Sequence, residues 1–410
     1  MQSIFSSNEN LMKPTINILF LTHYFPPEVN APAIRTFEHA KTWIQKGAAV
    51  TVMTNTPNHP RGKVFDGYKN QNVSEMNQGI RVLRLKTYLT PNSGFSRRII
   101  NYVIFALRAI WQARKIKQVD VVIATSPQFF CGIAGAVISK IKRKPFILEI
   151  RDIWPESIIS VGLLKNRAII QILEQMEKWM VLSADLAISV TRGIQQHLQH
   201  LGQKKVLFIP NGVLTSNFSV SADAEKKVGI VIAYSGTIGL AHNVENLVLA
   251  ARYFADNTGI KFMIIGDGSE REKIEKLCQG MNNLKLYPLL PRADLFVLLE
   301  TIDIGIVSLI NQRLFEGALP SKMFEYLAMG KPVILSLPEG EATQLVRDHD
   351  CGLTVLPEDT SDLIRAIECY VNDPGLLKIH GQNGRKMIKN KFDRNLLALD
   401  MLDAIVAEID

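Results

Sequence analysis

Three side chains near residue 320 could bind a ligand that carries both phosphate and hydroxyl groups. They are Ser321, Lys322 and Glu325, within the segment PSKMFEYLAMGKPV at 320–333. Apolar residues recur at helical spacing through this segment, and Pro320 is of a type that opens helices. One interpretation is a capped helix that packs on a core and leaves one Glu in solvent. The other is an anion site at a helix N-terminus, where Lys322 binds phosphate and Glu325 binds hydroxyl groups.

Four polar or glycine-rich turns favour the anion site. Each follows a predicted strand in the second half of the chain: GTIGLAHN after 228–235, GDGSE after 261–265, SLINQRLFEGALPSK after 303–307 and SLPEGE after 333–335. The carboxyl ends of parallel strands meet at one edge of a sheet, and ligands bind at that edge. A single Gly-x-Gly turn is weak evidence. The four turns together with the Pro-Ser-Lys helix start predict a site for a phosphate-bearing ligand.

The sequence argues against a dinucleotide cofactor and against a metal ion. Dinucleotide-binding domains carry Gly-x-Gly-x-x-Gly after the first strand, whereas the first strand here continues into THYFPPEVNAPAIR, which has no glycine. The sequence Asp348-His349-Asp350 precedes a predicted strand at 352–356, which places it at the other edge of the sheet. We therefore expect no metal and no cofactor. Lys and Arg side chains and helix N-termini would stabilise a leaving diphosphate instead.

The strands and helices that must position these residues alternate along almost the whole chain. Apolar strands are predicted in the first half at 16–22, 49–54, 82–85, 120–125, 146–150, 185–190 and 206–209. With 410 residues, this α/β pattern predicts two doubly wound domains with parallel sheets and a cleft between them. The predicted division is 1–209, a linker of turn formers at 210–227, a second domain at 228–392, and a C-terminal helix at 393–410 that packs back on the first domain.

The composition is that of a globular protein, with 47% hydrophobic and 21% charged residues. The four cysteines lie far apart along the chain, which favours reduced thiols over disulfides or zinc: Cys131, Cys278, Cys351 and Cys369. The longest apolar run near the N-terminus, 16–21, is too short for a signal sequence or a membrane span. These features predict a cytoplasmic protein. Trp43 and Trp179 are expected in the core.

The two halves of the chain have opposite charge. Residues 1–205 carry 27 Lys and Arg against 12 Asp and Glu, a net charge of +15, whereas 206–410 carry 20 against 27, a net charge of −7. No acidic residue occurs at 76–119, where a basic helix with aromatic residues is predicted. This helix fits either an interfacial contact with an anionic membrane or a core helix with a solvated basic face. The candidate membrane contacts are Arg97, Arg98, Phe105, Trp111, Arg114 and Lys115. Nucleic acid is not expected as a partner, because no nucleic-acid-binding motif is present.

Titratable residues also follow two strands of the first half. They are His23, Glu28, Arg151, Asp152 and Glu156. Asp152-x-Trp-Pro-Glu156 by itself reads as a helix N-terminus with acids in its first turn. A carboxylate that faces a nucleotide site could instead act as a base or bind an acceptor hydroxyl. His59 and Arg61, in a proline-rich loop, are further candidates for the acceptor side.

Several motifs resemble a known enzyme family. IPNGV at 209–213, IGDGSEREKIE at 265–275 and ALPSKMFEYLAMGKPVI at 318–334 resemble the retaining glycosyltransferases of family 4, which have the two-domain GT-B fold. In the first half, the motifs are similar to the branch that includes the O-antigen N-acetyl-L-fucosaminyltransferase: LTHYFPPEVNAPAIR at 21–35, PNHPRGKVFDGY at 57–68 and EIRDIWPESIISVG at 149–162. The resemblance covers essentially the whole chain.

The resemblance implies a reaction. A sugar, of the N-acetylated amino or deoxyamino type, would pass from a UDP-sugar to a polyprenyl-diphosphate-linked saccharide, in O-antigen or capsule synthesis at the inner membrane face. The first domain would hold the acceptor. Without a dependable nucleophile on the donor side, same-face attack assisted by the leaving diphosphate is favoured over a covalent intermediate. A UDP-sugar 2-epimerase and a non-catalytic sugar-nucleotide-binding scaffold remain as alternatives.

The resemblance also implies roles for individual residues. Glu325 matches the ribose-binding Glu of the family, and its diphosphate contacts match Ser321, Lys322 and the turn formed by Gly236, Thr237 and Gly239. The loops Gly266-Asp267-Gly268 and 339–341 would border the base and the donor sugar. The chain departs from the family at Gly317, where a Glu is expected, and at 240–243, where basic residues are expected. Arg313 is the candidate replacement for the missing phosphate-binding charge.

Overall fold

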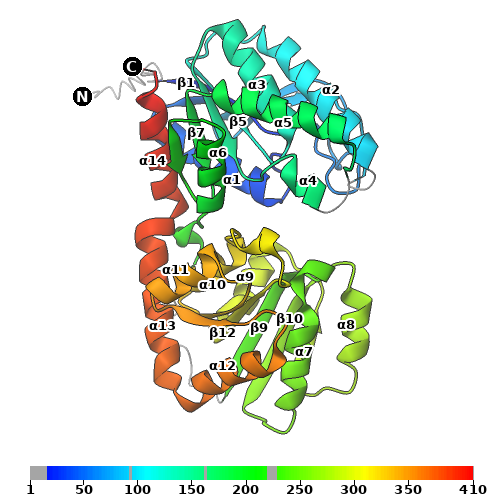
Figure 1. The fold of residues 1–410 in the computed structure, drawn as a ribbon, viewed down its shortest axis with the longest axis vertical. Helices are drawn as coiled ribbons and strands as arrows, with labels where there is room; N and C mark the ends of the chain where they lie inside the picture. The colour runs from blue at the N-terminus through cyan, green and yellow to red at the C-terminus, as the bar shows by residue number, and fades with distance from the viewer. Residues whose placement is uncertain (1–15, 92–94, 161–163, 219–228, 410) are drawn as a thin grey trace, which may run out of the picture. The chain divides into compact units, whose positions relative to one another are not determined.

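The computed structural model describes residues 16–91, 95–160, 164–218 and 229–409. The chain forms two compact units. The first contains 1–190, 194–209 and 398–410, and the second contains 191–193 and 210–397. Each unit contains one sheet with helices packed on it (Figure 1).

The first unit has an eight-stranded sheet with the order β3-β4-β2-β1-β5-β6-β7-β8. The strands are β1 Asn17–Leu21, β2 Ala49–Asn55, β3 Val73–Asn77, β4 Ile80–Leu85, β5 Val121–Thr125, β6 Phe146–Ile150, β7 Leu186–Ser189 and β8 Val206–Phe208. All neighbours are parallel except β3, which is antiparallel to β4. The predicted doubly wound sheet is therefore confirmed, with one antiparallel strand added at its edge. The sequence VSEMN did not predict β3 because an exposed edge strand has no need of an apolar run.

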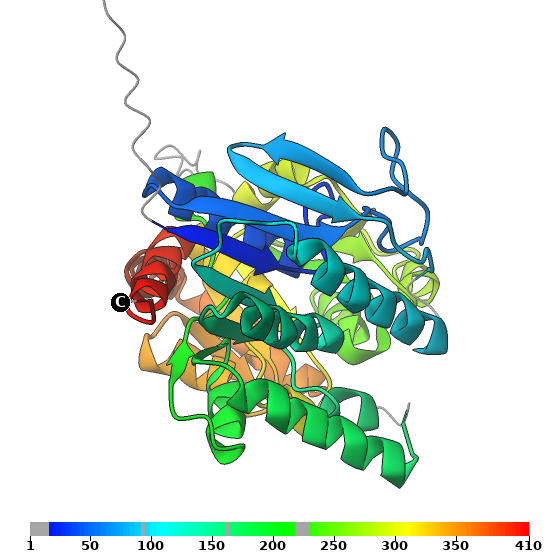
Figure 2. The ribbon, with the colours of Figure 1, turned by 90° about the horizontal axis from the view of Figure 1, so that it is seen from above.

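Helices of the first unit follow the strands as the alternation predicts. They are α1 Ala31–Gln45, α2 Phe95–Ala113, α3 Phe129–Lys142, α4 Glu156–Ser160, α5 Arg167–Leu182 and α6 Arg192–His200. Helix α1, for example, is capped at its N-terminus by Asn30, whose side chain accepts a hydrogen bond from the Ala33 amide. The chain runs from β1 to β2 in one direction and from β5 to β6 in the other, so right-handed crossovers place α1 and α3 on opposite faces. Helices α2, α3 and α5 run alongside one another (Figure 2).

The second unit has a six-stranded parallel sheet with the order β11-β10-β9-β12-β13-β14. The strands are β9 Ile230–Thr237, β10 Ile260–Asp267, β11 Leu284–Tyr287, β12 Ile304–Ser308, β13 Val333–Ser336 and β14 Gly352–Val355. Its α-helices are α7 Val244–Tyr253, α8 Arg271–Leu277, α9 Arg292–Glu300, α10 Ser321–Ala328, α11 Glu341–Asp348, α12 Thr360–Asn372 and α13 Pro374–Met387. The direction of the chain reverses between β9 and β12. The turns after these two strands therefore diverge and leave room for a ligand at the carboxyl edge.

The chain passes between the units at two places. The first follows Ile209, and the predicted linker falls partly at 219–228, outside the described residues. The second lies in α14, Arg394–Val406, which begins in the second unit and ends in the first. In the first unit, the indole N–H of Trp43 donates to the carbonyl oxygen of Ala398 at 2.7 Å. None of the helices in the described segments combines the length and hydropathy that a bilayer crossing needs.

Candidate active site

The turns after β9 and β10 touch through their backbones. A Cβ atom added to Gly266 would lie 1.7 Å from the carbonyl oxygen of Gly236, and one added to Gly268 would lie 2.3 Å from that of Ile238. Only glycine fits at these positions, which also have positive φ. The Asp267 carboxylate accepts a hydrogen bond from the Gly268 amide at 2.8 Å, so it stabilises the turn itself. Because these glycines have no side chains, the backbone at the ends of β9 and β10 is open to close approach by another group.

Lys322 lies across this backbone surface. A methyl group added to Gly236 would be 2.1 Å from Cε and 2.5 Å from Nζ of Lys322. Burial lowers the pKa of the Lys322 ammonium, and the negative charge of Glu325 opposes the shift in part. Among the described residues, no carboxylate is within ion-pair distance of this ammonium. A half-buried ammonium that makes no direct ion pair is partly desolvated without compensation, so the position suits a bound anion.

The N-terminus of α10 adds to this anion site. Ser321 is the first helical residue of α10 and is exposed. Pro320 occupies the cap position, and no side chain caps the helix there. The first amide groups of α10 therefore point outward without a capping oxygen, and the helix dipole favours an anion beside them.

Glu325 lies one turn further along α10. Its carboxylate Oε1 is 3.8 Å from Nη2 of Arg292, the first residue of α9. The Arg292 guanidinium also stacks 5.1 Å from the centre of the Phe296 ring. Sequence reasoning missed Arg292 because it did not predict β11, the short strand that precedes α9. The available signal was that Arg292, like the predicted site residues, follows the carboxyl end of a strand.

The loop between β12 and α10 contains Gly317 and Arg313, the two positions singled out by the departures from the family. A Cβ atom added to Gly317 would meet nothing within 4 Å, so crowding does not account for the missing Glu. The carbonyl oxygen of Glu316 accepts a hydrogen bond from the Glu341 amide at 2.9 Å, which joins this loop to α11. Arg313 is exposed, in a short turn at Arg313–Phe315. Thr237 is exposed at the end of β9, where its carbonyl oxygen accepts from the Tyr234 hydroxyl at 2.6 Å.

His242, in the turn Leu240–His242 after Gly239, stands where the family has basic residues. Burial and the charge of Lys322 both lower the pKa of the His242 imidazole. The imidazole is therefore neutral near neutral pH while the site is empty. A negative charge added beside it would favour the protonated form.

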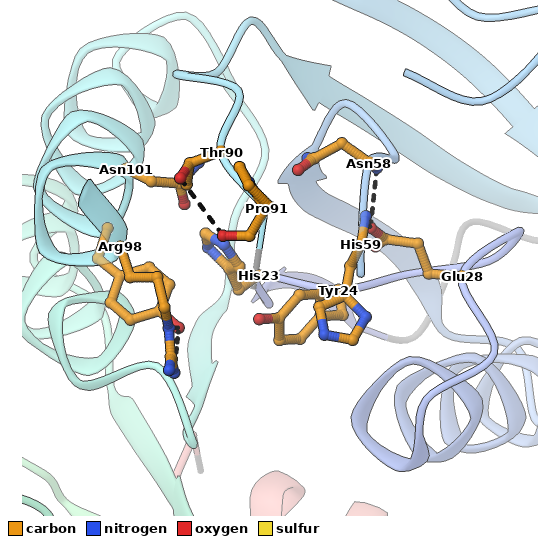
Figure 3. A pocket seen from close by; sticks show the side chains of 10 residues that line it. His23, Tyr24, Glu28, Asn58, His59, Thr90, Pro91, Arg98 and Asn101 are labelled. Atoms are coloured by element: carbon orange, nitrogen blue, oxygen red, sulfur yellow. Dashed lines mark hydrogen bonds between the residues drawn. The ribbon is translucent and has the colours of Figure 1, made fainter. Parts of the chain in front are cut away.

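In the first unit, three of the predicted acceptor-side residues line one small pocket, of about 20 Å³ (Figure 3). These three are His23, Glu28 and His59, and we call this the His23 pocket. The Glu28 carboxylate accepts hydrogen bonds from the amides of Asn58 at 3.0 Å and His59 at 2.9 Å. Burial raises the pKa of Glu28, and these amide bonds oppose the shift. Glu28 thus holds the loop that carries His59.

His23 itself is a neutral group. Burial, reinforced by His59 and Arg98, lowers the pKa of the His23 imidazole to about 3. At neutral pH it is a hydrogen-bonding group, and with this pKa it would be a weak general base. Burial and the Arg98 charge also lower the pKa of His59.

Two of the residues predicted for the membrane contact point elsewhere. Arg98 lines the His23 pocket, and its Nη2 lies 3.2 Å from the Tyr102 hydroxyl oxygen. The prediction for Phe105 is wrong: its side chain is fully buried, 5.2 Å from the His23 ring centre. Helical spacing explains both, because residues 98, 101, 102 and 105 share the face of α2 that is turned toward the pocket. Trp111 remains 60% exposed, and Arg114 stacks on it at 5.4 Å.

The structure does not bring the other first-unit candidates into the His23 pocket. Burial raises the pKa of Asp152, whose carboxylate is hydrogen-bonded to the Ser157 side chain and the Ile153 backbone. Asp152 lines a different, smaller hollow, of about 10 Å³, together with Trp154. These bonds stabilise the turn between β6 and α4. Glu156 and Arg61 are exposed, and the positive charge of Arg151 helps to lower the pKa of the buried Glu149.

The comparisons with known proteins agree with this geometry. Residues 33–217 match the model described as Glycosyltransferase Family 4, and residues 218–387 match the model described as Glycosyl transferases group 1. The putative colanic acid biosynthesis glycosyl transferase WcaI of Escherichia coli (strain K12) is 25% identical over 394 residues, which cover 90% of this chain and 95% of that protein.

Solved structures show the same fold. Sucrose-phosphate synthase from Thermosynechococcus elongatus superposes with a TM-score of 0.73 at 18% identity, covering 96% of this chain and 98% of that one. HepE of Anabaena, in complex with UDP-glucose, gives a TM-score of 0.66 at 15% identity, with 96% and 100% covered. The two family models divide the chain between its two Rossmann-like units. The chain therefore belongs to the glycosyltransferases of the GT-B type, with a family 4 first domain and a group 1 second domain.

Proposed function

We propose that the protein transfers a sugar from a UDP-sugar to a polyprenyl-diphosphate-linked saccharide, with retention of configuration. The observation that carries the donor assignment is Lys322, whose half-buried ammonium has no carboxylate within ion-pair distance among the described residues and lies on the Gly236 backbone at the uncapped start of α10. A diphosphate supplies the missing negative charge, and the charge on it grows as the sugar departs. HepE, which has the same fold, binds UDP and UDP-glucose.

On the donor side, Glu325 is suited to the ribose and Lys322 to the diphosphate. A carboxylate accepts hydrogen bonds from two neighbouring hydroxyls, which is the pattern that a ribose offers. The Arg292 guanidinium, 3.8 Å from the Glu325 carboxylate, helps to orient it. Arg313 is proposed as the source of the second phosphate-binding charge. The donor sugar is expected to be an N-acetylated amino or deoxyamino sugar, as in the resembling branch.

On the acceptor side, we place a hydroxyl group of the saccharide at the His23 pocket, whose volume of about 20 Å³ admits a group of about the size of a water molecule. Neutral imidazoles of His23 and His59 offer hydrogen bonds to sugar hydroxyls, and the Arg98 guanidinium offers a charge for an anionic group of the acceptor. Asp152 and Glu156 remain the candidates for a base or for a contact with the acceptor, together with Arg61 and Arg151. Same-face attack needs no protein nucleophile, because the departing diphosphate can take the proton of the acceptor hydroxyl.

The cellular setting that we propose is bacterial O-antigen or capsule synthesis, with the protein held peripherally at the inner face of the membrane. The name of WcaI refers to colanic acid biosynthesis, which is the synthesis of a polysaccharide. The test is mass spectrometry of lipid-linked glycans from cells with and without the protein. An acceptor shortened by one sugar, accumulating only in the deleted strain, is the expected result. An unchanged glycan profile would contradict the proposal.

Two alternatives predict different outcomes. A UDP-sugar 2-epimerase would convert UDP-GlcNAc in the absence of any acceptor, whereas a transferase leaves it largely intact. A non-catalytic scaffold would tolerate Asp152→Ala and Glu156→Ala in a complementation assay. Loss of complementation by correctly folded variants favours the transferase.

Activity is expected to persist in EDTA. In the part of the chain that the structure describes, no group of three or more His, Cys, Asp or Glu side chains is placed to hold a metal ion. Lys322 and the α10 N-terminus can carry the charge of the diphosphate instead. Transfer rates should be measured after EDTA treatment and after re-addition of magnesium or manganese. Complete loss with EDTA, restored by the metal, would contradict this prediction.

Removal of basic residues from α2 is expected to release the protein from anionic membranes. Each Lys or Arg at such a surface contributes roughly 1 kcal/mol, screened by salt. Arg97, Arg114 and Lys115 are exposed, so their joint replacement by Gln should reduce co-sedimentation with phosphatidylglycerol vesicles roughly 100-fold. We leave Arg98 intact because it lines the His23 pocket. The matched control removes three exposed charges elsewhere in the first unit: Lys41→Gln, Lys46→Gln and Lys204→Gln. Equal loss in both variants would mean that only net charge matters.

A further inference from the structure

Helix α5 exposes an unusual number of large apolar side chains. Ile169 is 46% exposed, Ile172 59% and Leu182 49%. Trp179, which the sequence placed in the core, is 39% exposed. Only Glu177, Met180 and Val181 of this helix are buried, so its N-terminal part packs on little of the protein. A water-exposed helix of this length would normally turn such side chains inward.

An apolar groove runs along the same helix. Its volume is about 570 Å³, and it is lined by Ile133 of α3 and by α5 side chains that include Ile172, Met176 and Trp179. Such a groove can accept methylene chains, because its wall is mainly hydrocarbon and contains no charged side chain.

Exposed cations lie on α5 and beside this apolar surface. Lys140 of α3 places its ammonium 4.7 Å from the centre of the Trp179 ring. Further exposed cations on α5 and the ends of its neighbours are Arg143, Lys165, Arg167 and Lys178. Of the acidic residues on α5, Glu177 is engaged with His197 at 2.9 Å, which leaves Glu174 as the exposed one. Apolar side chains, a Trp and a ring of cations are the features of a helix that lies in a membrane interface.

Helix α5 lies in the same layer of helices as α2. Helix α3 packs against both α2 and α5, and the three helices lie side by side (Figure 2). On α2, Leu107 is 63% exposed and Trp111 60%. The two flanking helices therefore each expose apolar residues and a Trp, with the largely buried α3 between them.

We propose that α5, together with its groove against α3, is a second membrane-contacting surface whose occupant is an anionic phospholipid bilayer. The side chains of Ile169, Ile172 and Trp179 enter the acyl-chain region, and Lys140 and Lys178 remain at the headgroups. The charge complementarity favours anionic lipid over a second copy of this chain, because two such basic surfaces would repel each other. This contact does not depend on the transfer reaction, so the test separates it from the proposed function.

The test uses the full chain with Trp111→Phe, which leaves Trp179 as the main Trp that could report on this surface. Vesicles of phosphatidylglycerol and phosphatidylcholine with brominated acyl chains should quench Trp179 emission, and phosphatidylcholine alone should not. The variant Ile169→Gln with Ile172→Gln should reduce vesicle partitioning by about tenfold or more. Its matched control replaces exposed apolar residues of the second unit, Leu249→Gln with Ile379→Gln, and should partition like the parent.

Three results would overturn the proposal. In the first, brominated lipid does not quench Trp179 emission. In the second, the α5 variant partitions into vesicles as strongly as the parent. In the third, sedimentation velocity shows that the parent self-associates and that the α5 variant does not. The last result would assign this surface to a second copy of the chain. Quenching is measured with α5 unchanged, so it decides the matter even if the Gln variant fails to fold.

Discussion

Lys322→Ala is expected to lower kcat by about 100-fold or more, with a smaller effect on UDP binding. The ammonium lies on the Gly236 backbone beside the start of α10, where the charge of a departing diphosphate develops. An interaction that strengthens as the bond breaks stabilises the transition state more than the bound substrate. Steady-state kinetics and calorimetric UDP titrations measure the two effects separately.

The control for Lys322 is Lys276→Ala, which removes an exposed ammonium from α8 of the same unit. It should turn over like the parent. If Lys322→Ala also binds UDP and turns over like the parent, residues 320–325 form only a helix start, and the donor assignment fails. A moderate change in melting temperature with full activity would lead to the same conclusion.

Glu325→Ala is expected to weaken UDP binding by roughly 100-fold or more, with a smaller effect on kcat at saturating donor. Hydrogen bonds to a charged group contribute about 1.5–3 kcal/mol each, and the Glu325 carboxylate can accept two from ribose hydroxyls. Glu325→Gln keeps the shape but not the charge, so it should fall between the parent and Glu325→Ala. The control is Glu300→Ala, at the exposed end of α9.

Glu325→Ala should also change the pH dependence of kcat/KM. The negative charge of Glu325 raises the pKa of Lys322, against the effect of burial. Without that charge the ammonium loses its proton at lower pH, so the alkaline limb of kcat/KM should move to lower pH. The effects of Lys322→Ala and Glu325→Ala should then be non-additive in the double variant. Unchanged UDP affinity together with an unchanged pH profile would contradict the role assigned to Glu325.

Much of the fold follows from local pattern. Apolar strands that alternate with amphipathic helices predict parallel sheets wherever a strand is buried on both faces, as β5 and β6 are. The strands at the sheet edges were missed, β3 because its residues are exposed and β11 because it is short and half-buried. An edge strand forms by hydrogen bonding to one neighbouring strand, so its own residues need show little of the apolar pattern that predicts a buried strand.

The sequence by itself determined which side chains could bind a nucleotide-sugar, because the glycine turns and the helix start at Lys322 all follow strand ends, and strand ends of a parallel sheet share one edge. Only the tertiary structure decided which partners these side chains have. It brought Arg292 to Glu325 from another helix, turned Arg98 and Phe105 away from the surface, and left Trp179 exposed. The physical reason is that helical spacing shows which residues share a face, whereas the packing of neighbouring elements decides whether that face meets protein or solvent.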